Sequence, residues 1–264
     1  MVEFIGSKFN RSISDDGTYV MAVTEAVYDY NAFTKFKQDP RYTAILEHAS
    51  IQQGKECIEI IRSKSPNLIT RINDFKKNDL EGGAIIHQYE EIGEISSSTL
   101  RYLKVASDIK TIFGENLAGN IAEVGVGYGG QLLINDEIFN FNEYHLFDLP
   151  PVLKLASKYL ECHILNNCYQ TYTLNQHNGL IDYDLSISNY AFSELPSKLQ
   201  SKYIEKIFSK SRRGYLTMNS GLTNSAFQTD KLSLAELKNL LPKFEVIDEK
   251  PLTHPGNYII VWGI

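Results

Sequence analysis

A glycine cluster in the middle of the chain has the residue types of a ligand-binding turn. The stretch Ile121–Gln131 begins with an apolar run, passes through Glu123 and contains four glycines; the apolar residues 132–134 can open a helix. Glycine adopts backbone angles closed to other residues and lets a ligand approach the main chain closely. The free N–H groups of a following helix point at the same place. The stretch therefore predicts a strand, a tight turn and a helix that together bind a nucleotide-type cofactor.

Two cofactor classes fit this loop. Gly125, Gly127 and Gly130 match G-x-G-x-x-G, the dinucleotide fingerprint. Gly125, Gly127 and Gly129, with Glu123 two residues upstream, match the E/D-x-G-x-G-x-G loop of methyltransferases that use S-adenosylmethionine (SAM). A glycine-rich turn without a ligand is the third interpretation. The loop alone does not separate NAD from SAM.

An acidic residue ends the next apolar segment. Residues 144–147 are apolar or aromatic apart from His145, and Asp148 follows them. An acid at the end of the second strand accepts hydrogen bonds from ribose hydroxyls in either cofactor class. The alternative role for Asp148 is a helix cap or a solvated loop carboxylate. Its position downstream of the glycine loop favours the ribose role.

Composition limits the classes of protein to which the chain can belong. Its 264 residues are 43% hydrophobic and 22% charged, with a formal net charge of −6. Such a chain can fold around a packed core, and the acidic balance argues against nucleic-acid binding as its main function. Cys57, Cys162 and Cys168 show no zinc-binding spacing. We expect no secretory signal, no membrane span and a cytoplasmic location.

Short strands alternate with helices from residue 96 onward. Strands are expected near 121–124, 144–148, 170–174, 183–189, 215–219, 244–247 and 257–262. This alternation predicts an α/β fold with a doubly wound, mostly parallel sheet. The last two strands, separated by Pro255-Gly256, are expected to form an antiparallel hairpin.

The first 95 residues have a different pattern. Apolar and aromatic residues recur at helical spacing between residues 19 and 61, so we predict an N-terminal helical subdomain over 1–95 and a cofactor-binding domain over 96–264. Residues 62–95 look irregular, and could be a loop over the active site or an ordinary connector. Residues 96–99 are expected to cap a helix that runs to Gly114.

Taken together, the motifs resemble those of bacterial sugar O-methyltransferases of the class I SAM-dependent type. The matching pieces are Tyr28–Phe33, Ile45–His48, Phe75–Asp79, Thr99–Tyr102, Glu123–Gln131, Phe147–Pro150 and Ser188–Glu194. The resemblance implies a Rossmann-like sheet of seven strands, SAM as cofactor, and methyl transfer to a hydroxyl of a sugar or sugar nucleotide in surface-polysaccharide synthesis. It also implies that Asp148 and Leu149 contact the cofactor, with Glu123, Gly125, Gly127 and Gly129.

The resemblance does not supply the catalytic base, which we infer from position. Ligands in such sheets lie at the carboxyl ends of the strands, so Asn189, Tyr190 and Glu194 should face the reacting methyl group. Glu194 is the first candidate for a general base or metal ligand; the alternative is a carboxylate that stabilises a helix N-terminus. His177 is a further catalytic candidate because histidine titrates near neutrality.

Other polar residues are candidates for binding. His87 and His254 are expected at the acceptor site, although a lone loop histidine is often only a surface residue. Arg101 could bind the methionyl carboxylate of SAM or an acceptor phosphate, or form a helix-surface salt bridge. Gln131 and Gln176 are expected at the methionine and adenine ends of the cofactor, and Asn189 is also expected to contact it.

Four functions therefore stay open. The leading one is an O-methyltransferase for a sugar or sugar nucleotide; the second is the same chemistry on a non-sugar small molecule, with or without a phosphate. The third is an NAD-dependent oxidoreductase, and the fourth is a SAM-binding protein without catalysis. The sequence shows no tight ligand cluster that requires a divalent metal, and leaves metal dependence and a homo-oligomeric state undecided.

Overall fold

A seven-stranded sheet organises the molecule, and the computed structural model describes it together with the surrounding helices over residues 17–220 and 230–264. The strand order is β5-β4-β3-β6-β7-β9-β8, and β9 runs antiparallel to both of its neighbours. The strands are β3 (Ile121–Val124), β4 (Glu143–Phe147), β5 (Cys168–Tyr172), β6 (Tyr183–Asn189), β7 (Ser211–Met218), β8 (Phe244–Asp248) and β9 (Tyr258–Trp262). This order, with one reversed strand, is the class I methyltransferase-like fold, and the predicted α/β sheet and final hairpin are confirmed.

Alternating side chains assign the two faces of the sheet. In β6, Leu185 and Ile187 point into one core, while the intervening Ser186 and Ser188 point to the other face. In β3, Ile121 and Ala122 likewise belong to different cores. This period of two is the geometry of an extended strand. It explains why a sheet covered on both faces can be recognised from short apolar runs.

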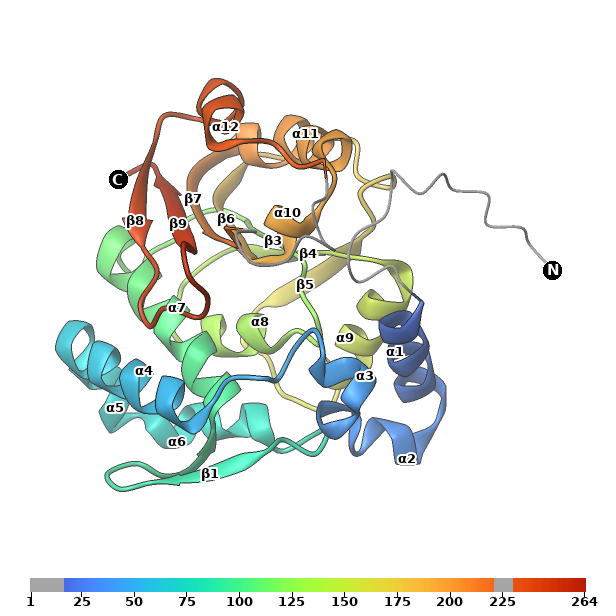
Figure 1. Cartoon of the computed structure of the whole chain (residues 1–264), viewed down its shortest axis with the longest axis vertical. Coiled ribbons are helices and arrows are strands. Elements are labelled where there is room, and N and C mark those ends of the chain that lie inside the picture. Colours follow the sequence, from blue (N-terminus) through green and yellow to red (C-terminus); the bar gives the residue numbers. More distant parts are fainter. Residues whose placement is uncertain (1–16, 221–229) are drawn as a thin grey trace.

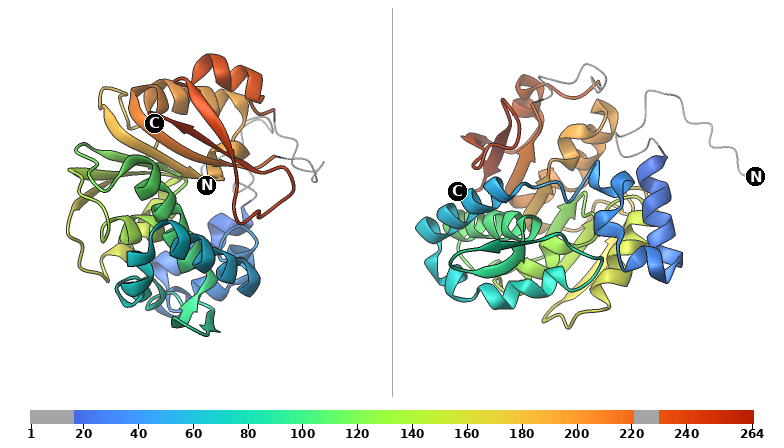
Figure 2. Two further views of the ribbon diagram at one scale, coloured as in Figure 1. Left: turned by 90° about the vertical axis from the view of Figure 1, so that its left-hand side faces the viewer. Right: turned by 60° about the horizontal axis from the view of Figure 1, so that its bottom comes forward.

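Helices cover both faces of the sheet (Figures 1 and 2). α7, α8 and α9 pack on one face with the N-terminal helices, and α10, α11 and α12 cover the other. Their bounds are α7 (Ser97–Phe113), α8 (Gly130–Asn135), α9 (Pro150–Leu160), α10 (Ala191–Glu194), α11 (Ser197–Lys206), the 3₁₀ turn η5 (Phe208–Lys210) and α12 (Leu234–Leu240). As expected, Ser96 caps α7, because its hydroxyl accepts the Thr99 N–H at 3.0 Å.

Short helices make up most of the N-terminal region. They are α1 (Thr18–Tyr28), α2 (Tyr30–Phe33), η3 (Phe36–Gln38), α3 (Pro40–Thr43), α4 (Ile51–Lys64), α5 (Pro66–Thr70), α6 (Ile72–Phe75) and η4 (Lys76–Asp79). α4 begins at a capping box formed by Ser50 and Gln53. One hydrophobic cluster joins this helical region to the sheet. The proposed boundary at residue 95 stays a prediction.

The segment 62–95 differs from its expected irregular form. It contains the end of α4, α5, α6, η4 and a two-stranded hairpin, β1 (Ile86–Tyr89) with β2 (Gly93–Ser96). The hairpin was missed because its strands carry no apolar run: β1 buries only Tyr89, and β2 only Ile95 and Ser96. η4 leads to Asp79, whose carboxylate accepts hydrogen bonds from Ser96 and Thr99 at the start of α7. The segment therefore anchors α7 and is not a loop over the cavity described below.

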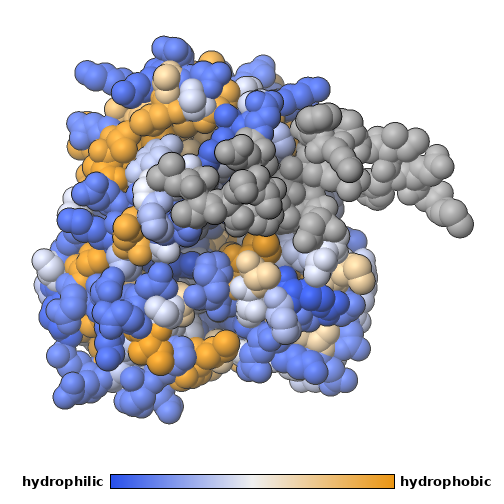
Figure 3. Space-filling view, in the orientation of Figure 1, coloured by the Kyte–Doolittle hydropathy of each residue, from blue (hydrophilic) through white to orange (hydrophobic). Residues whose placement is uncertain are grey.

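The hydropathy of the surface and of the described helices agrees with the composition of a chain that folds around a packed core. The face in Figure 3 is mostly hydrophilic, and apolar side chains gather at its upper left, over the region of β8 and β9. No helix in the described part of the chain has both the length and the apolar character that crossing a membrane requires.

Candidate active site

A cavity of about 660 Å³ lies at the carboxyl ends of β3, β4, β5 and β6. This is the position where open α/β sheets bind ligands, and the volume is within the usual range for small-molecule sites. The structure brings most of the predicted site residues to its wall: Arg101, Glu123, Gly125, Gly127, Asp148, Leu149, Asn189, Tyr190, Glu194 and His254. The predicted glycine loop and the strand-end residues therefore belong to one site.

The glycine loop has the backbone that its sequence predicts. Gly125, Gly127 and Gly129 have φ values of +79°, +54° and +88°, which disfavour any residue with a Cβ. A Cβ on Gly125 would also lie only 2.0 Å from the Ala191 Cβ. Gly130 has no such positive φ. All three glycines with positive φ occupy the glycine positions of G-x-G-x-G. Only two of them, Gly125 and Gly127, occupy glycine positions of G-x-G-x-x-G.

A chain of buried hydrogen bonds runs behind the cavity wall. Each side chain in it donates to the next: Asn189 to Gln131 (3.2 Å), Gln131 to Asn135 (3.0 Å), Asn135 to Tyr144 (3.1 Å) and Tyr144 to Glu123 (2.8 Å). Networks in which every member is paired hold side chains in one orientation. Gln131 is fully buried and not part of the wall, so it positions Asn189 and does not itself face the cavity as predicted.

Asp148 joins the ends of β3 and β4. Its Oδ2 accepts the Val126 N–H at 2.8 Å, and its Oδ1 accepts the Leu149 N–H at 2.7 Å. Both oxygens of the carboxylate therefore hold backbone N–H groups, one in the glycine loop and one in the turn before α9. Asp148 does not cap α9, which has no side-chain cap. It fixes the loop and also lines the cavity, so its role towards ribose hydroxyls stays a prediction.

Carboxyl groups outnumber cationic groups around the cavity. Glu123, Asp148 and Glu194 line it, against the single guanidinium of Arg101 among the described lining residues. Burial raises the pKa of Glu123 to about 8, opposed by the hydrogen bond from Tyr144. A cation placed beside this carboxyl would favour its ionised form. The electrostatics suit a positively charged ligand better than one with two phosphates.

Tyr190 and Glu194 follow β6, as predicted. Tyr190 has φ +68°, an unusual value for a residue with a side chain, and its N–H donates to the Thr217 carbonyl at 2.9 Å. Burial raises the pKa of Glu194, while a hydrogen bond from Asn219 (2.8 Å) and the charge of Lys231 oppose this shift. A carboxyl whose pKa is raised towards neutrality is suited to accepting a proton.

Several predicted residues are not brought to the cavity. His177 is buried behind it: Phe147 packs edge-on against its ring at 5.1 Å, and its Nε2 lies 2.9 Å from the Tyr183 hydroxyl. Burial also lowers the pKa of His177. Its environment is that of a core residue, so the structure gives no support to a catalytic role. The loop after β5 does reach the cavity, but through the neighbouring Leu174 and Asn175 and not through His177.

Three further residues that were predicted at the site do not line the cavity. Gln176 is exposed, and its side-chain oxygen accepts the Thr173 N–H at 2.8 Å, which closes a turn. His87 lies on β1, in the hairpin at the bottom of Figure 1, and does not line the cavity. Gly129 caps α8 and packs against Leu160. Gly129 therefore supports the backbone of the loop and does not line the cavity.

Other residues of the wall were missed by the sequence reasoning. Tyr102 and His48 line the cavity, and Glu249 lines a smaller one beside it. The signal for Glu249 was available: it follows β8, which is parallel to β7, so it lies at the same edge of the sheet as Asn189. His48 follows α3 in the chain, and only the tertiary packing brings this segment over the sheet edge.

A metal centre is not apparent in the described residues, 17–220 and 230–264. No group of three or more His, Cys, Asp or Glu side chains there could hold a metal ion. Glu194 instead pairs with the Asn219 amide.

Comparisons with known proteins extend this description only as far as the fold. No family model and no curated protein matches the sequence. Similar solved structures include TehB from Haemophilus influenzae, with 15% identity and a TM-score of 0.44 over 60% of this chain and 60% of that one. A SAM-dependent methyltransferase from Clostridium acetobutylicum has 10% identity and a TM-score of 0.42, over 55% and 84% of the two chains.

A third similar structure contains the cofactor. It is phosphoethanolamine N-methyltransferase 2 from Haemonchus contortus in complex with SAM, with 15% identity and a TM-score of 0.45 over 72% of this chain and 46% of that one. The chain spans 60% of TehB and 55% of the pyocyanin biosynthetic protein PhzM. At such identities and TM-scores the similarity does not extend to what the chain binds, and the fold class rests on the observed strand order, that of class I methyltransferases.

Proposed function

We propose that this chain is a SAM-dependent methyltransferase that acts on a hydroxyl of a small molecule. The observation that carries the proposal is the cavity wall, where a G-x-G-x-G turn, Asp148 and Glu123 meet at the carboxyl ends of β3 and β4. The three carboxyl groups of this wall suit the sulfonium and the ammonium of SAM, because a bound cation favours their ionised form. The pyrophosphate of NAD would find one guanidinium beside these carboxyl groups, and its negative charge would disfavour their ionisation.

The residues around the cavity suggest how the cofactor is held. Asp148 can accept the ribose hydroxyls, Leu149 and Leu174 can flank the adenine, and Asn189 is presented by the hydrogen-bond chain behind it. When bound, SAM supplies an electrophilic methyl group on its sulfonium. Glu194 lines the same cavity and is our candidate to take the proton from the acceptor hydroxyl.

The acceptor class is supported by the sequence motifs alone. Their resemblance to bacterial sugar O-methyltransferases favours a sugar or sugar-nucleotide hydroxyl, and hence surface-polysaccharide synthesis. The oxygen specificity also depends on this resemblance, because a carboxyl such as Glu194 could equally serve another nucleophile.

Calorimetric titration of the purified protein with SAM, S-adenosylhomocysteine and NAD(H) tests the proposal. We expect micromolar binding of the first two and none of NAD(H). Asp148→Ala should weaken SAM binding at least tenfold through lost ribose contacts, while Asp182→Ala, in the loop before β6, serves as the matched control. Binding of NAD(H) alone would overturn the proposal and favour the dinucleotide interpretation of the loop.

A further inference from the structure

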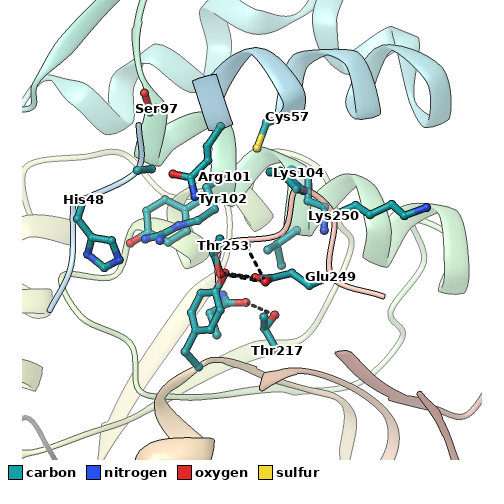
Figure 4. A pocket seen from close by; sticks show the side chains of 16 residues that line it. His48, Cys57, Ser97, Arg101, Tyr102, Lys104, Thr217, Glu249, Lys250 and Thr253 are labelled. Atoms are coloured by element: carbon teal, nitrogen blue, oxygen red, sulfur yellow. Dashed lines mark hydrogen bonds between the residues drawn. The ribbon is translucent and has the colours of Figure 1, made fainter. Parts of the chain in front are cut away.

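A second, smaller chamber adjoins the proposed cofactor cavity. Its volume is about 210 Å³, and the two cavities share His48, Arg101, Tyr102, Asn189, Tyr190 and Thr253. The rest of its wall comes from Ala49, α4, α7, β7 and the segment after β8. Figure 4 shows Arg101, Tyr102 and Lys104 lying across this space from Glu249 and Thr253. The chamber does not include the glycine loop or Asp148, so it lies beside the part of the cavity that would hold the nucleoside.

Arg101 is held in this chamber without an anionic partner among the described residues. Its guanidinium carbon lies 5.8 Å from the ring centre of Tyr102 and 5.9 Å from that of Tyr190. These aromatic faces support a planar cation but leave its N–H groups unpaired. The nearby Glu47 forms no ion pair with it, and burial raises the pKa of Glu47, which favours its neutral form.

The other buried cation of the chamber is already neutralised. Lys104 forms an ion pair with Asp108 at 2.7 Å, and both side chains are almost fully buried. Tyr215 donates a further hydrogen bond to Asp108 at 2.7 Å. Arg101 is therefore the group in the chamber that is ready to accept an anion, and its fork of N–H donors matches a carboxylate or phosphate.

Glu249 supplies an oriented acceptor in the same chamber. It is only 5% exposed, and it accepts hydrogen bonds from the Tyr190 hydroxyl, the Thr253 N–H (2.9 Å) and the Thr253 hydroxyl (2.9 Å). The Thr253 hydroxyl lies 2.9 Å from both carboxylate oxygens but has one proton to donate. Three donors therefore fix the carboxylate, and one of its about four acceptor positions is left. Tyr190 thus touches both charged groups, with its ring beneath Arg101 and its hydroxyl on Glu249.

We propose that this chamber is the acceptor subsite of the methyltransferase proposed above, and that it selects an acceptor carrying both an anionic group and a hydroxyl. The anionic group pairs with Arg101, and a hydroxyl donates to Glu249. The volume is below the roughly 300–1,000 Å³ usual for sites that hold drug-sized ligands. It suits an acceptor of the size of a sugar acid or sugar phosphate, and not a sugar nucleotide.

Binding of three defined probes tests this proposal. D-glucuronate, D-glucose 6-phosphate and D-glucose would be titrated into the protein saturated with S-adenosylhomocysteine, and binding followed by ligand-observed NMR. We expect at least one charged probe to bind tenfold or more tightly than glucose; comparison of the two charged probes distinguishes carboxylate from phosphate. Binding of none of them, or equal binding of all three, would overturn the proposal.

Substitutions of Arg101 and Glu249 test whether these two residues bind the anionic group and the hydroxyl of the probes. Arg101→Gln should abolish the preference for the charged probe, Arg101→Lys should retain part of it, and Glu249→Gln should weaken all hydroxylated probes several-fold. Arg62→Gln removes the same charge from the exposed face of α4 and is the control.

Titration with S-adenosylhomocysteine separates the chamber proposal from the cofactor proposal. Each variant should bind it within about twofold of wild type, which also shows that the variant is folded. If Arg101→Gln lost tenfold in this affinity while keeping the anion preference, Arg101 would serve the methionyl carboxylate and the subsite proposal would be wrong. Failure of the wild-type protein to bind S-adenosylhomocysteine would instead refute the cofactor itself.

Discussion

Glu123 and Glu194 line the same cavity but have different partners. Glu123 is buried at the end of the hydrogen-bond chain that begins at Asn189, whereas Glu194 is partly exposed and pairs with the Asn219 amide. Burial raises the pKa of both carboxyls. Glu123 adjoins the glycine loop, so we expect its substitution to change cofactor binding. Glu194 follows β6, so we expect its substitution to change turnover.

Glu123 should make SAM binding depend on pH. With a pKa of about 8 in the free protein, Glu123 is largely protonated at pH 6.5, and a bound cation favours its ionised form. Binding then releases a proton, so affinity should increase with pH, by up to about tenfold per unit, and level off above about pH 8. Calorimetry at pH 6.5, 7.5 and 8.5 would measure this trend.

The variant Glu123→Gln provides the comparison for this trend. It keeps an acceptor for the Tyr144 hydroxyl but removes the titrating group, so the difference in affinity from wild type should be small at pH 6.5 and largest at pH 8.5. Any change in the ionisation of SAM with pH affects the measurements on both proteins equally. Parallel pH profiles for the two proteins would show that Glu123 does not titrate on binding.

Glu194→Gln tests the proposed base. The amide cannot accept a proton, so we expect turnover to fall by about 10²–10³ while the affinity for SAM changes less than threefold. The measurement is formation of S-adenosylhomocysteine with an acceptor found by screening. Glu205→Gln, the same change on α11, is the control. Full turnover in Glu194→Gln would exclude this residue as the base.

At the scale of elements, the turn between β3 and α8 is shaped by its contact with α10. Gly125 faces Ala191, the first residue of α10, and its N–H donates to the Phe147 carbonyl at 2.9 Å. The cofactor loop, the end of β4 and the start of α10 therefore meet at one glycine. A side chain there would disturb three elements at once.

Gly125→Ala should damage both stability and cofactor binding. Its Cβ would lie 2.0 Å from the Ala191 Cβ at a φ of +79°, so we expect a loss of at least about 3 kcal/mol in the free energy of unfolding and at least a tenfold loss in SAM affinity. Urea denaturation and calorimetry would measure the two effects.

Gly114→Ala is the matched control for this change. Gly114 has a φ of +81°, but a Cβ there would meet nothing within 4 Å. Its ψ of −176° lies in a region essentially confined to glycine, so alanine should cost only backbone strain, about 1–3 kcal/mol, and leave SAM binding unchanged. Equal destabilisation by the two substitutions would mean that the contact with α10 relaxes freely.

At the scale of the whole molecule, a buried lysine joins the N-terminal helices to the cofactor loop. Lys37 is fully buried; its Nζ donates to the Asn78 carbonyl at 2.7 Å and lies 4.1 Å from the ring centre of Tyr128. Tyr128 belongs to the glycine loop, and the Tyr159 hydroxyl on α9 also donates to Asn78. Three parts of the chain distant in sequence therefore share one polar cluster.

Lys37 should make stability increase with pH. Burial lowers its pKa from 10.5 to about 8, opposed by Glu47 and Asp79. The folded state then binds fewer protons than the unfolded state between about pH 8 and 10.5, so its contribution to stability rises through that window. Relative to Lys37→Met, the wild-type free energy of unfolding should gain about 2 kcal/mol from pH 7 to pH 9.5. Urea denaturation of both proteins at the two pH values would measure this; a constant difference would contradict it.

Much of the local structure could be predicted from sequence. The β3–glycine–α8 turn, the strands and the Ser96 cap of α7 depend on residues close together in the chain, through apolar periodicity, glycine conformation and capping. The rule that strand ends form the site also located Asn189, Tyr190 and Glu194 at the cavity.

Only the tertiary structure decided which side chains meet. His177 and Gln176 follow β5 but turn into the core and into a local turn, whereas Glu249 and Arg101 are 148 positions apart in sequence and line one chamber. The sequence determined the elements and their order, because local backbone preferences and periodicity specify them. The packing of α7 and the order of the strands in the sheet determined the site, because long-range packing sets which faces and strand ends come together.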